Sequence, residues 1–77
     1  MSVAEKYIKI SEKLKALGNP TRFAILVGLL KDECNVTQIQ QKLDLPQSTV
    51  SQHLNILKNI NIIQGKRKGT QVCYQII

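Results

Sequence analysis

The beginning of the chain carries apolar side chains at helical spacing. Val3, Tyr7, Ile10, Leu14 and Leu17 follow one another at intervals of four, three, four and three residues. This spacing puts them on one narrow stripe of a helix, which is typical of a seam between two helices. We therefore predict a helix over residues 1–17, beginning near Ser2. The stripe can pack on its own domain or on a second subunit, and the small core of a short chain favours the second.

A second helix should begin at Pro20 and end near Lys31. Gly18 can end the first helix, Asn19 can cap the next one, and proline suits a first helical position. Residues 23–30 are apolar on most sides of this helix. The pattern predicts that the second helix is the buried centre of the fold.

A break at residues 32–35 precedes two helices joined by a short turn. Thr37 and Gln40 have the spacing of a capping box, so a short helix should begin there. Pro46 disfavours a helical conformation in the residue before it, which indicates a turn. A longer helix should then occupy residues 47–59.

The end of the chain has the pattern of strands. Residues 62–63 and 72–76 flank Gly65–Gly69, which we interpret as a glycine-bracketed hairpin loop. The fold class predicted is mainly α with a small β-hairpin. Two helices joined by a tight turn (residues 36–59) and followed by a hairpin (residues 62–76) make a winged helix-turn-helix. We expect residues 1–77 to form one such domain.

The predicted helix over residues 47–59 has two contrasting faces. Val50, Leu54 and Leu57 fall within a narrow arc and should face the core. The opposite face carries short hydroxyl and amide groups and no acid, whereas an ordinary exposed helix more often carries Glu/Lys pairs. Such groups suit contacts with phosphates and base edges. The predicted DNA-binding residues of this helix are Gln47, Ser48, Thr49, Ser51, Gln52, His53 and Asn55.

Charge supports a polyanionic partner. Lysine and arginine number 11 against 5 acidic residues, which gives a net charge of +6. Lys66, Arg67 and Lys68 lie in the predicted hairpin loop and form a second predicted DNA contact; a solvated basic turn is the alternative. His53 lies at the margin of the core face, where a DNA contact and a structural hydrogen bond that orients the helix are equally compatible with the pattern.

The two cysteines, Cys34 and Cys73, offer three interpretations. In the alternation of a strand, Cys34 falls on the same side as Val36, whereas Cys73 falls on the side opposite the apolar residues of its own segment. The two thiols should therefore point to different sides. We therefore expect inert thiols, with a redox switch and a metal site as alternatives. Metal ligands at a recognised spacing are missing, as are a cofactor motif and a nucleophile–base pair. The sequence predicts neither an enzyme nor a metal, cofactor or small-molecule site.

The pattern also bears on location. No apolar run approaches the roughly 20 residues that span a bilayer. The first residues lack the basic region and apolar block of a signal peptide, and two cysteines do not make a secreted disulfide scaffold. We expect a cytoplasmic protein without a membrane anchor.

Three segments resemble the ArsR/SmtB family of winged-helix repressors: residues 14–26 (LKALGNPTRFAIL), 47–54 (QSTVSQHL) and 68–74 (KGTQVCY). The resemblance covers nearly the whole chain. It implies a homodimer that binds an imperfect inverted repeat in double-stranded DNA near a promoter and blocks transcription. It also implies that residues 47–55 are the recognition helix and that residues 65–69 are the wing.

The chain departs from the family pattern in two places. Asn35 and Thr37 stand where many metal-sensing members have cysteines, so the chain resembles the non-metal-sensing members. The C-terminal dimerisation helix that is common in the family is absent from this sequence. The expected dimer interface is therefore the stripe of Val3, Tyr7, Ile10, Leu14 and Leu17.

Two other functions are compatible with the same residues. One is a protein-interaction module or antagonist that forms mixed dimers with a longer paralogue. The other is a thiol redox-responsive regulator that uses Cys34 and Cys73.

Overall fold

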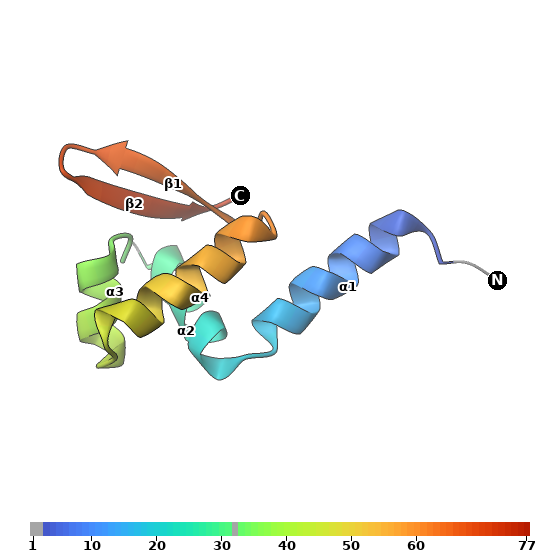
Figure 1. Ribbon diagram of the computed structural model, residues 1–77, viewed down its shortest axis with the longest axis horizontal. Coiled ribbons are helices and arrows are strands. Elements are labelled where there is room, and N and C mark those ends of the chain that lie inside the picture. The colour runs from blue at the N-terminus through green and yellow to red at the C-terminus, as the bar shows by residue number, and fades with distance from the viewer. Residues whose placement is uncertain (1–2, 32) are drawn as a thin grey trace.

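The computed structural model describes residues 3–31 and 33–77. Its elements are α1 (Glu5–Leu17), α2 (Pro20–Leu30), α3 (Val36–Leu43), α4 (Gln47–Asn59), β1 (Ile63–Lys68) and β2 (Gln71–Ile76) (Figure 1). This order confirms the predicted fold class, and no helix follows β2 in the described part of the chain. Ser2 and Asp32, which the sequence assigns to the start of the first helix and to the break after the second, lie outside the described residues.

Side-chain caps set the starts of α2 and α3. The Asn19 side chain accepts hydrogen bonds from the backbone N–H groups of Thr21 (2.9 Å) and Arg22 (3.2 Å), as the sequence predicts. The prediction for α3 is wrong, because Asn35 rather than Thr37 is its cap and accepts from the N–H of Gln38 at 2.8 Å. Asparagine is the stronger N-cap. The earlier start also makes Val36 the first helical residue, where it packs against the core.

α4 lies at the centre of the core. Its Val50, Leu54 and Leu57 are at most 1% exposed, which confirms the predicted core face. They form one cluster with Ile25, Ile39 and the two isoleucines that lead into β1. This burial fixes the rotation of α4 about its axis, so its polar face must point away from the core.

α2 is not the buried centre that its composition predicts. Only Ile25 and Gly28 of α2 are buried, while Phe23 and Leu30 are 56% and 72% exposed. α2 packs on α4 and β2 with one side. No described element of the chain covers its outer side, so apolar residues there remain at the surface.

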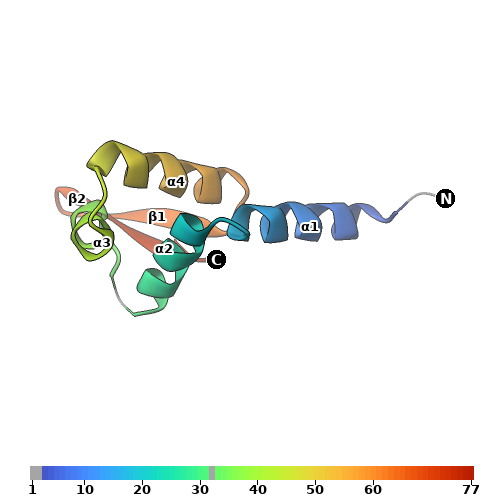
Figure 2. The ribbon, with the colours of Figure 1, turned by 90° about the horizontal axis from the view of Figure 1, so that it is seen from below.

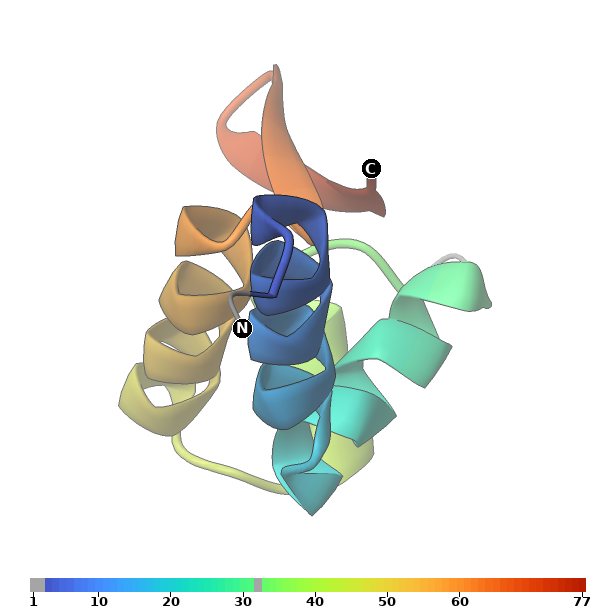
Figure 3. The same ribbon diagram turned by 90° about the vertical axis from the view of Figure 1, so that its right-hand side faces the viewer.

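α1 extends away from the other elements. The chain measures 48 × 24 × 21 Å, and it is elongated because α1 projects to one side of the other elements (Figures 1 and 2). None of its residues is buried, and exposure falls only at its last two residues, Ala16 and Leu17. Seen from the N-terminal side of the molecule, α1 stands in front of the helical body, with the hairpin above it (Figure 3).

The hairpin turn is tighter than the sequence predicts. β1 and β2 pair antiparallel from Ile63↔Ile76 to Lys68↔Gln71, so the basic residues 66–68 belong to strand β1 rather than to a loop. Gly69, at φ 62°, occupies the turn in a left-handed conformation that glycine adopts without strain. Gly65 lies within β1, where it pairs with Tyr74. A glycine suits this position because the side chains of Val72 and Tyr74 cross over it, and a Cβ there would lie 3.0 Å from Val72 Cγ1.

Cys34 and Cys73 form a disulfide, with their Cα atoms 4.7 Å apart. The prediction of inert thiols on different sides is therefore wrong. The carbonyl oxygen of Cys34 accepts a hydrogen bond from Tyr74 N at 2.8 Å, so the segment before α3 lies beside β2. Cys73 is the buried residue of β2 (8% exposed), whereas Val72 and Ile76 are each 38% exposed. Contact with the Cys34 segment decides which face of this strand is covered, and apolar alternation along the strand does not.

Candidate nucleic-acid interface

The outward face of α4 presents the polar side chains that the sequence assigns to DNA. Gln47, Ser48, Gln52 and Asn55 are exposed, and none of them carries a charge. The flanking residues Thr49, Ser51 and His53 are half-buried. This face therefore has a central group of exposed amides and a hydroxyl, with partly covered side chains along its edges.

The first turn of α4 suits contact with an anion. Pro46 occupies the N-cap position, and no side chain caps the helix. The first turn also contains no acidic residue. Unpaired N–H groups and the positive end of the helix dipole then lie beside the Gln47 and Ser48 side chains, an arrangement that favours phosphate oxygens.

The basic residues of β1 divide between the two faces of the hairpin. All three are exposed, but the register pairs Arg67 with Val72 and Lys66 with Cys73, and side chains alternate along a strand. Val72 and Gln47 line the same cleft of about 260 Å³. Arg67 therefore shares the hairpin face of Val72, which turns toward the start of α4, whereas Lys66 and Lys68 share the face of the disulfide. Gln71, the partner of Lys68 beside the turn, reaches the same cleft.

Three contacts hold the hairpin against the start of α3. They are the disulfide, the hydrogen bond from Tyr74 N to Cys34 O, and a hydrogen bond from Asn35 Nδ2 to Gln71 Oε1 at 3.4 Å. Asn35 thus caps α3 and contacts the hairpin at the same time. Because α3 packs on α4, these contacts also set the position of the hairpin relative to the polar face of α4.

His53 makes a structural hydrogen bond, which is one of the two roles that the sequence allows for it. Its Nδ1 lies 3.2 Å from Nη1 of Arg22, on the first turn of α2. Nε of the same arginine donates to the carbonyl oxygen of Ala16, in the last turn of α1, at 2.7 Å. No sequence pattern singles out Arg22, because its role depends on a residue 31 positions away.

The same region accounts for Ile56, an apolar residue outside the core face of α4. Ile56 and Ile60 line a cleft together with Ala16 and Arg22, at the end of α1. The end of α1 and the C-terminal half of α4 therefore line one cleft, with Arg22 among the side chains that they share it with.

Four of the residues predicted for a dimer interface lie on α1, while Val3 precedes this helix, which begins at Glu5 rather than near Ser2 as the sequence predicts. Val3, Tyr7, Ile10 and Leu14 are between 53% and 64% exposed, while Leu17 is half-buried and packs against the core. Leu17 therefore belongs partly to the core of its own chain. The other four form an apolar stripe that no described part of the chain covers.

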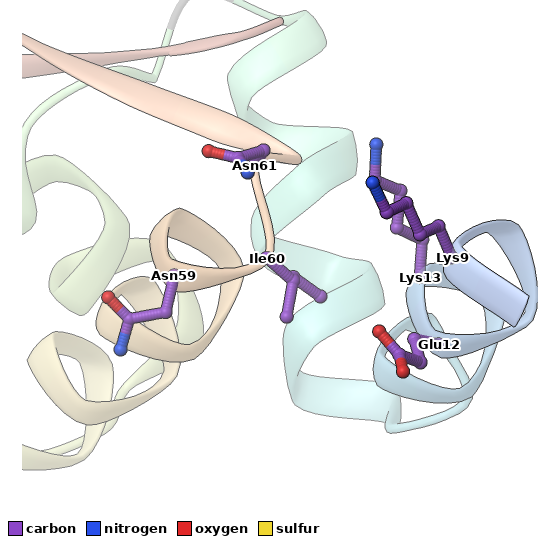
Figure 4. Close-up of a pocket in the computed structure, with 6 residues that line it drawn as sticks. All are labelled: Lys9, Glu12, Lys13, Asn59, Ile60 and Asn61. Carbon is purple, nitrogen blue, oxygen red and sulfur yellow. The ribbon is translucent and has the colours of Figure 1, made fainter. Parts of the chain in front are cut away.

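A cleft of about 240 Å³ separates the middle of α1 from the end of α4 (Figure 4). Lys9, Glu12 and Lys13 extend from the α1 side, and Asn59–Asn61 form the other side. The ion pair between Lys9 Nζ and Glu5 Oε1 (3.6 Å) joins two largely exposed side chains, so it contributes little stability. Contacts within the chain thus leave α1 weakly supported along most of its length.

Metal-binding and membrane-spanning features are missing from the described residues. These residues contain no group of three or more His, Cys, Asp or Glu side chains that could hold a metal ion. None of the helices described is both long and apolar enough to cross a bilayer.

Four helices with a polar outward face on the fourth, followed by a basic hairpin, are the architecture of winged-helix DNA-binding regulators. The family model described as "Bacterial regulatory protein, arsR family" matches residues 19–64, more than half of the chain. The chain belongs to this family. Its members are DNA-binding transcriptional regulators, not enzymes.

Individual relatives agree with this assignment. The chain is 43% identical over 74 residues to an uncharacterised HTH-type transcriptional regulator of Methanocaldococcus jannaschii, MJ1325, and covers 83% of it. It is 43% identical over 67 residues to the transcriptional repressor PagR of Bacillus anthracis, covering 67% of that protein. It spans about half the length of other curated relatives.

Solved structures show the same fold. The crystal structure of PagR superimposes with a TM-score of 0.84 at 40% identity, over 94% of this chain and 83% of that one. A homodimeric winged helix-turn-helix domain of Mycobacterium bovis, Mb0332, superimposes with a TM-score of 0.83 at 26% identity, over 99% of this chain and 74% of that one.

Proposed function

We propose that this protein is a cytoplasmic, homodimeric transcriptional repressor that binds an inverted repeat in double-stranded DNA. In this proposal residues 1–77 act as one winged-helix domain, with α4 in the major groove and the β1–β2 hairpin on the neighbouring backbone. The observation that carries it is the outward face of α4, where uncharged amides and a hydroxyl are exposed on a helix whose opposite face is locked into the core.

The chemistry of both elements supports DNA as the partner. Glutamine and asparagine can form paired hydrogen bonds with adenine, and serine can reach phosphates or base edges. Residues 66–68 add three positive charges on the hairpin, and the chain as a whole carries +6. Such charges release counterions from DNA and make binding depend on salt.

α1 supports a second copy of the chain as the partner for dimerisation. A helix of this length is marginal in water when it lacks tertiary contacts, yet α1 buries none of its residues in its own domain. Its exposed stripe is apolar, and two copies related by a twofold axis can cover each other's stripe. The homodimeric state of the Mycobacterium bovis relative agrees with this arrangement.

Selection from a pool of random duplexes tests the DNA-binding part. The expected product is an inverted repeat whose half-site centres lie about 10 base pairs, or roughly 34–36 Å, apart. Binding should weaken steeply as salt is raised. If no duplex is bound at low salt, the proposal fails, and the interaction module that forms mixed dimers with a longer paralogue takes its place.

Sedimentation velocity tests the dimer. Leu14→Glu puts a charge at the C-terminal end of the exposed stripe, on its most exposed side chain, and should convert the protein to monomer. Lys9→Glu, on another side of α1, introduces a glutamate without touching the stripe and should leave the dimer intact. A wild-type protein that sediments as a monomer at the concentrations at which it binds DNA would contradict the homodimer.

The Cys34–Cys73 disulfide favours a second function, thiol redox-responsive regulation. Oxidation removes one hydrogen from each thiol as the S–S bond forms, and a low-molecular-weight disulfide accepts both hydrogens as it becomes two thiols. In a reducing cytoplasm such a pair is more typical of redox sensing than of permanent crosslinking. The disulfide ties the hairpin to the segment before α3, so its reduction removes one of the three contacts that hold the hairpin against the start of α3.

DNA affinity measured with and without dithiothreitol tests this second function. The wild-type protein should change its affinity on reduction, and Cys34→Ser should bind equally under both conditions. Equal affinity of the oxidised and reduced wild-type protein would leave the disulfide without a regulatory role.

A further inference from the structure

Arg22 joins three helices through one side chain. It stands in the first turn of α2, where its Nε donates to the Ala16 carbonyl at the end of α1 and its Nη1 lies 3.2 Å from Nδ1 of His53 in α4. Both side chains are half-buried. The last carbonyl groups of a helix lack partners within the helix, so Arg22 also satisfies one of these groups in α1.

The chemistry of the Arg22–His53 pair determines which nitrogen of the imidazole carries the proton. A guanidinium group has five N–H donors and no acceptor, and it stays protonated in proteins. Nδ1 of His53 must therefore be the acceptor in this hydrogen bond. The ring is then neutral, with its single proton on Nε2, and that nitrogen is a hydrogen-bond donor.

Nε2 is free to reach a partner outside the chain. Among the described residues, no hydrogen bond involves Nε2, and no buried side-chain nitrogen or oxygen lacks a partner. Nε2 therefore meets solvent even though the ring as a whole is half-buried. His53 directly follows Gln52 in sequence and lies at the edge of the polar face of α4. Because Nδ1 is bonded to Arg22, the Nε2–H group is the one polar group of the ring that can still bind a partner.

We propose that Arg22 is a positioning residue that holds His53 as a neutral Nε2–H donor to a DNA phosphate oxygen. Phosphate oxygens accept hydrogen bonds from side chains at the edges of a recognition element, whereas base edges are reached from its centre. The inference rests on the proposed binding of α4 to DNA and adds the role of these two residues to it. Through Ala16, the same arginine connects the orientation of this donor to the end of α1.

Two substitutions at His53 separate its two nitrogens. Asn has an amide oxygen at the position of Nδ1 and nothing at the position of Nε2, so H53N keeps an acceptor for Arg22 and loses the donor to DNA. Gln has an amide N–H group at the position of Nε2, so H53Q keeps the donor. His and Asn have similar helix propensities, and H53N should therefore not weaken α4.

Fluorescence anisotropy with a random-sequence duplex and with a selected operator, at one salt concentration, measures the effect. H53N should remain folded and lose about tenfold or more in affinity for both duplexes, as expected for a hydrogen bond to a charged group. H53Q should keep most of the affinity. The proposal is overturned if H53N binds like the wild type, if H53Q loses as much as H53N, or if the loss is confined to one base pair of the operator.

Nitrogen-15 NMR tests the positioning role without DNA. His53 is the only histidine of the chain, so its ring signals need no assignment among several residues. The wild-type spectrum should show a protonated Nε2 and an unprotonated Nδ1, and Arg22→Met should yield a mixture of tautomers. A wild-type ring with its proton on Nδ1 would overturn the proposal. If the protein binds no DNA but shows the expected tautomer, the proposed function fails while the effect of Arg22 on the ring stands.

Discussion

Cys34 and Cys73 lie 39 residues apart in sequence, yet a disulfide joins them across a Cα–Cα distance of 4.7 Å. The loop that it closes contains α3, α4 and β1, which are the elements that we propose to bind DNA or to position the groups that do. Closing a loop of this length removes conformational freedom mainly from the unfolded chain. The disulfide therefore affects the stability of the domain as well as the attachment of its hairpin.

Reduction of the disulfide should lower the free energy of unfolding by roughly 4 kcal/mol, the chain-entropy value for a loop of about 40 residues. Urea denaturation of the wild-type protein with and without dithiothreitol measures the difference. The Cys34→Ser/Cys73→Ser double variant is the control and should unfold at the same urea concentration with or without reductant. Coincident curves for the oxidised and reduced wild type would contradict the prediction.

Asn35→Ala should destabilise the protein by about 1 kcal/mol, because it removes the side chain that caps α3. Thr37→Ala is the matched control, since the sequence pattern also allowed that threonine as the cap. Thr37 is exposed within the first turn of α3, so its substitution should lower the free energy of unfolding by less than about 0.5 kcal/mol. Chemical denaturation of both variants decides between the two caps, and the reverse order of the two values would move the cap to Thr37.

Gln52→Ala should reduce affinity for the operator by roughly 1–3 kcal/mol and relax the sequence preference at one base pair, if the exposed amide reads an adenine. Binding to a set of operators with single base changes measures this. Gln64→Ala removes another exposed glutamine, at the end of β1 away from the hairpin turn, and should leave affinity unchanged. An equal loss on all duplexes would make Gln52 a backbone contact.

Arg67→Ala should weaken binding more than Lys66→Ala/Lys68→Ala, although the second variant removes two charges. The reason is that Arg67 shares the hairpin face that turns toward the start of α4, and the two lysines share the opposite face. The slope of log affinity against log salt should fall by about 0.9 for each DNA phosphate that the variant no longer neutralises. If neither variant changes the slope, the hairpin does not contact the DNA backbone.

Local patterns were sufficient for α4 and for the cap of α2. The periodicity of Val50, Leu54 and Leu57 identifies both the extent of α4 and its buried face, because the side chains that repeat every turn of a helix must share one environment. The polar composition of the opposite face then follows from the same periodicity. The Asn19-Pro20 start of α2 is likewise a property of neighbouring residues.

Local patterns could not predict how far α2 is buried, or where the basic residues lie in the hairpin. An apolar helix is buried only where other elements cover it, and the outer side of α2 has no such cover among the described residues. Residues 66–68 have the composition of a loop, but pairing with β2 extends the strand through them to a turn at Gly69. Strand pairing is a contact between segments, so composition at one segment does not reveal it.

Residue order thus established the helices, their caps to within two residues, and the polar face that we propose to bind DNA, since each depends on side chains within one or two helical turns. Three features depend on segments that meet in space although they are separated along the chain by up to 39 residues. These are the disulfide, the side of the hairpin on which each basic residue lies, and the hydrogen bond from Arg22 to His53. Packing of the core around α4 brings these segments together. No local pattern encodes such distances, so these contacts became visible in the folded chain alone.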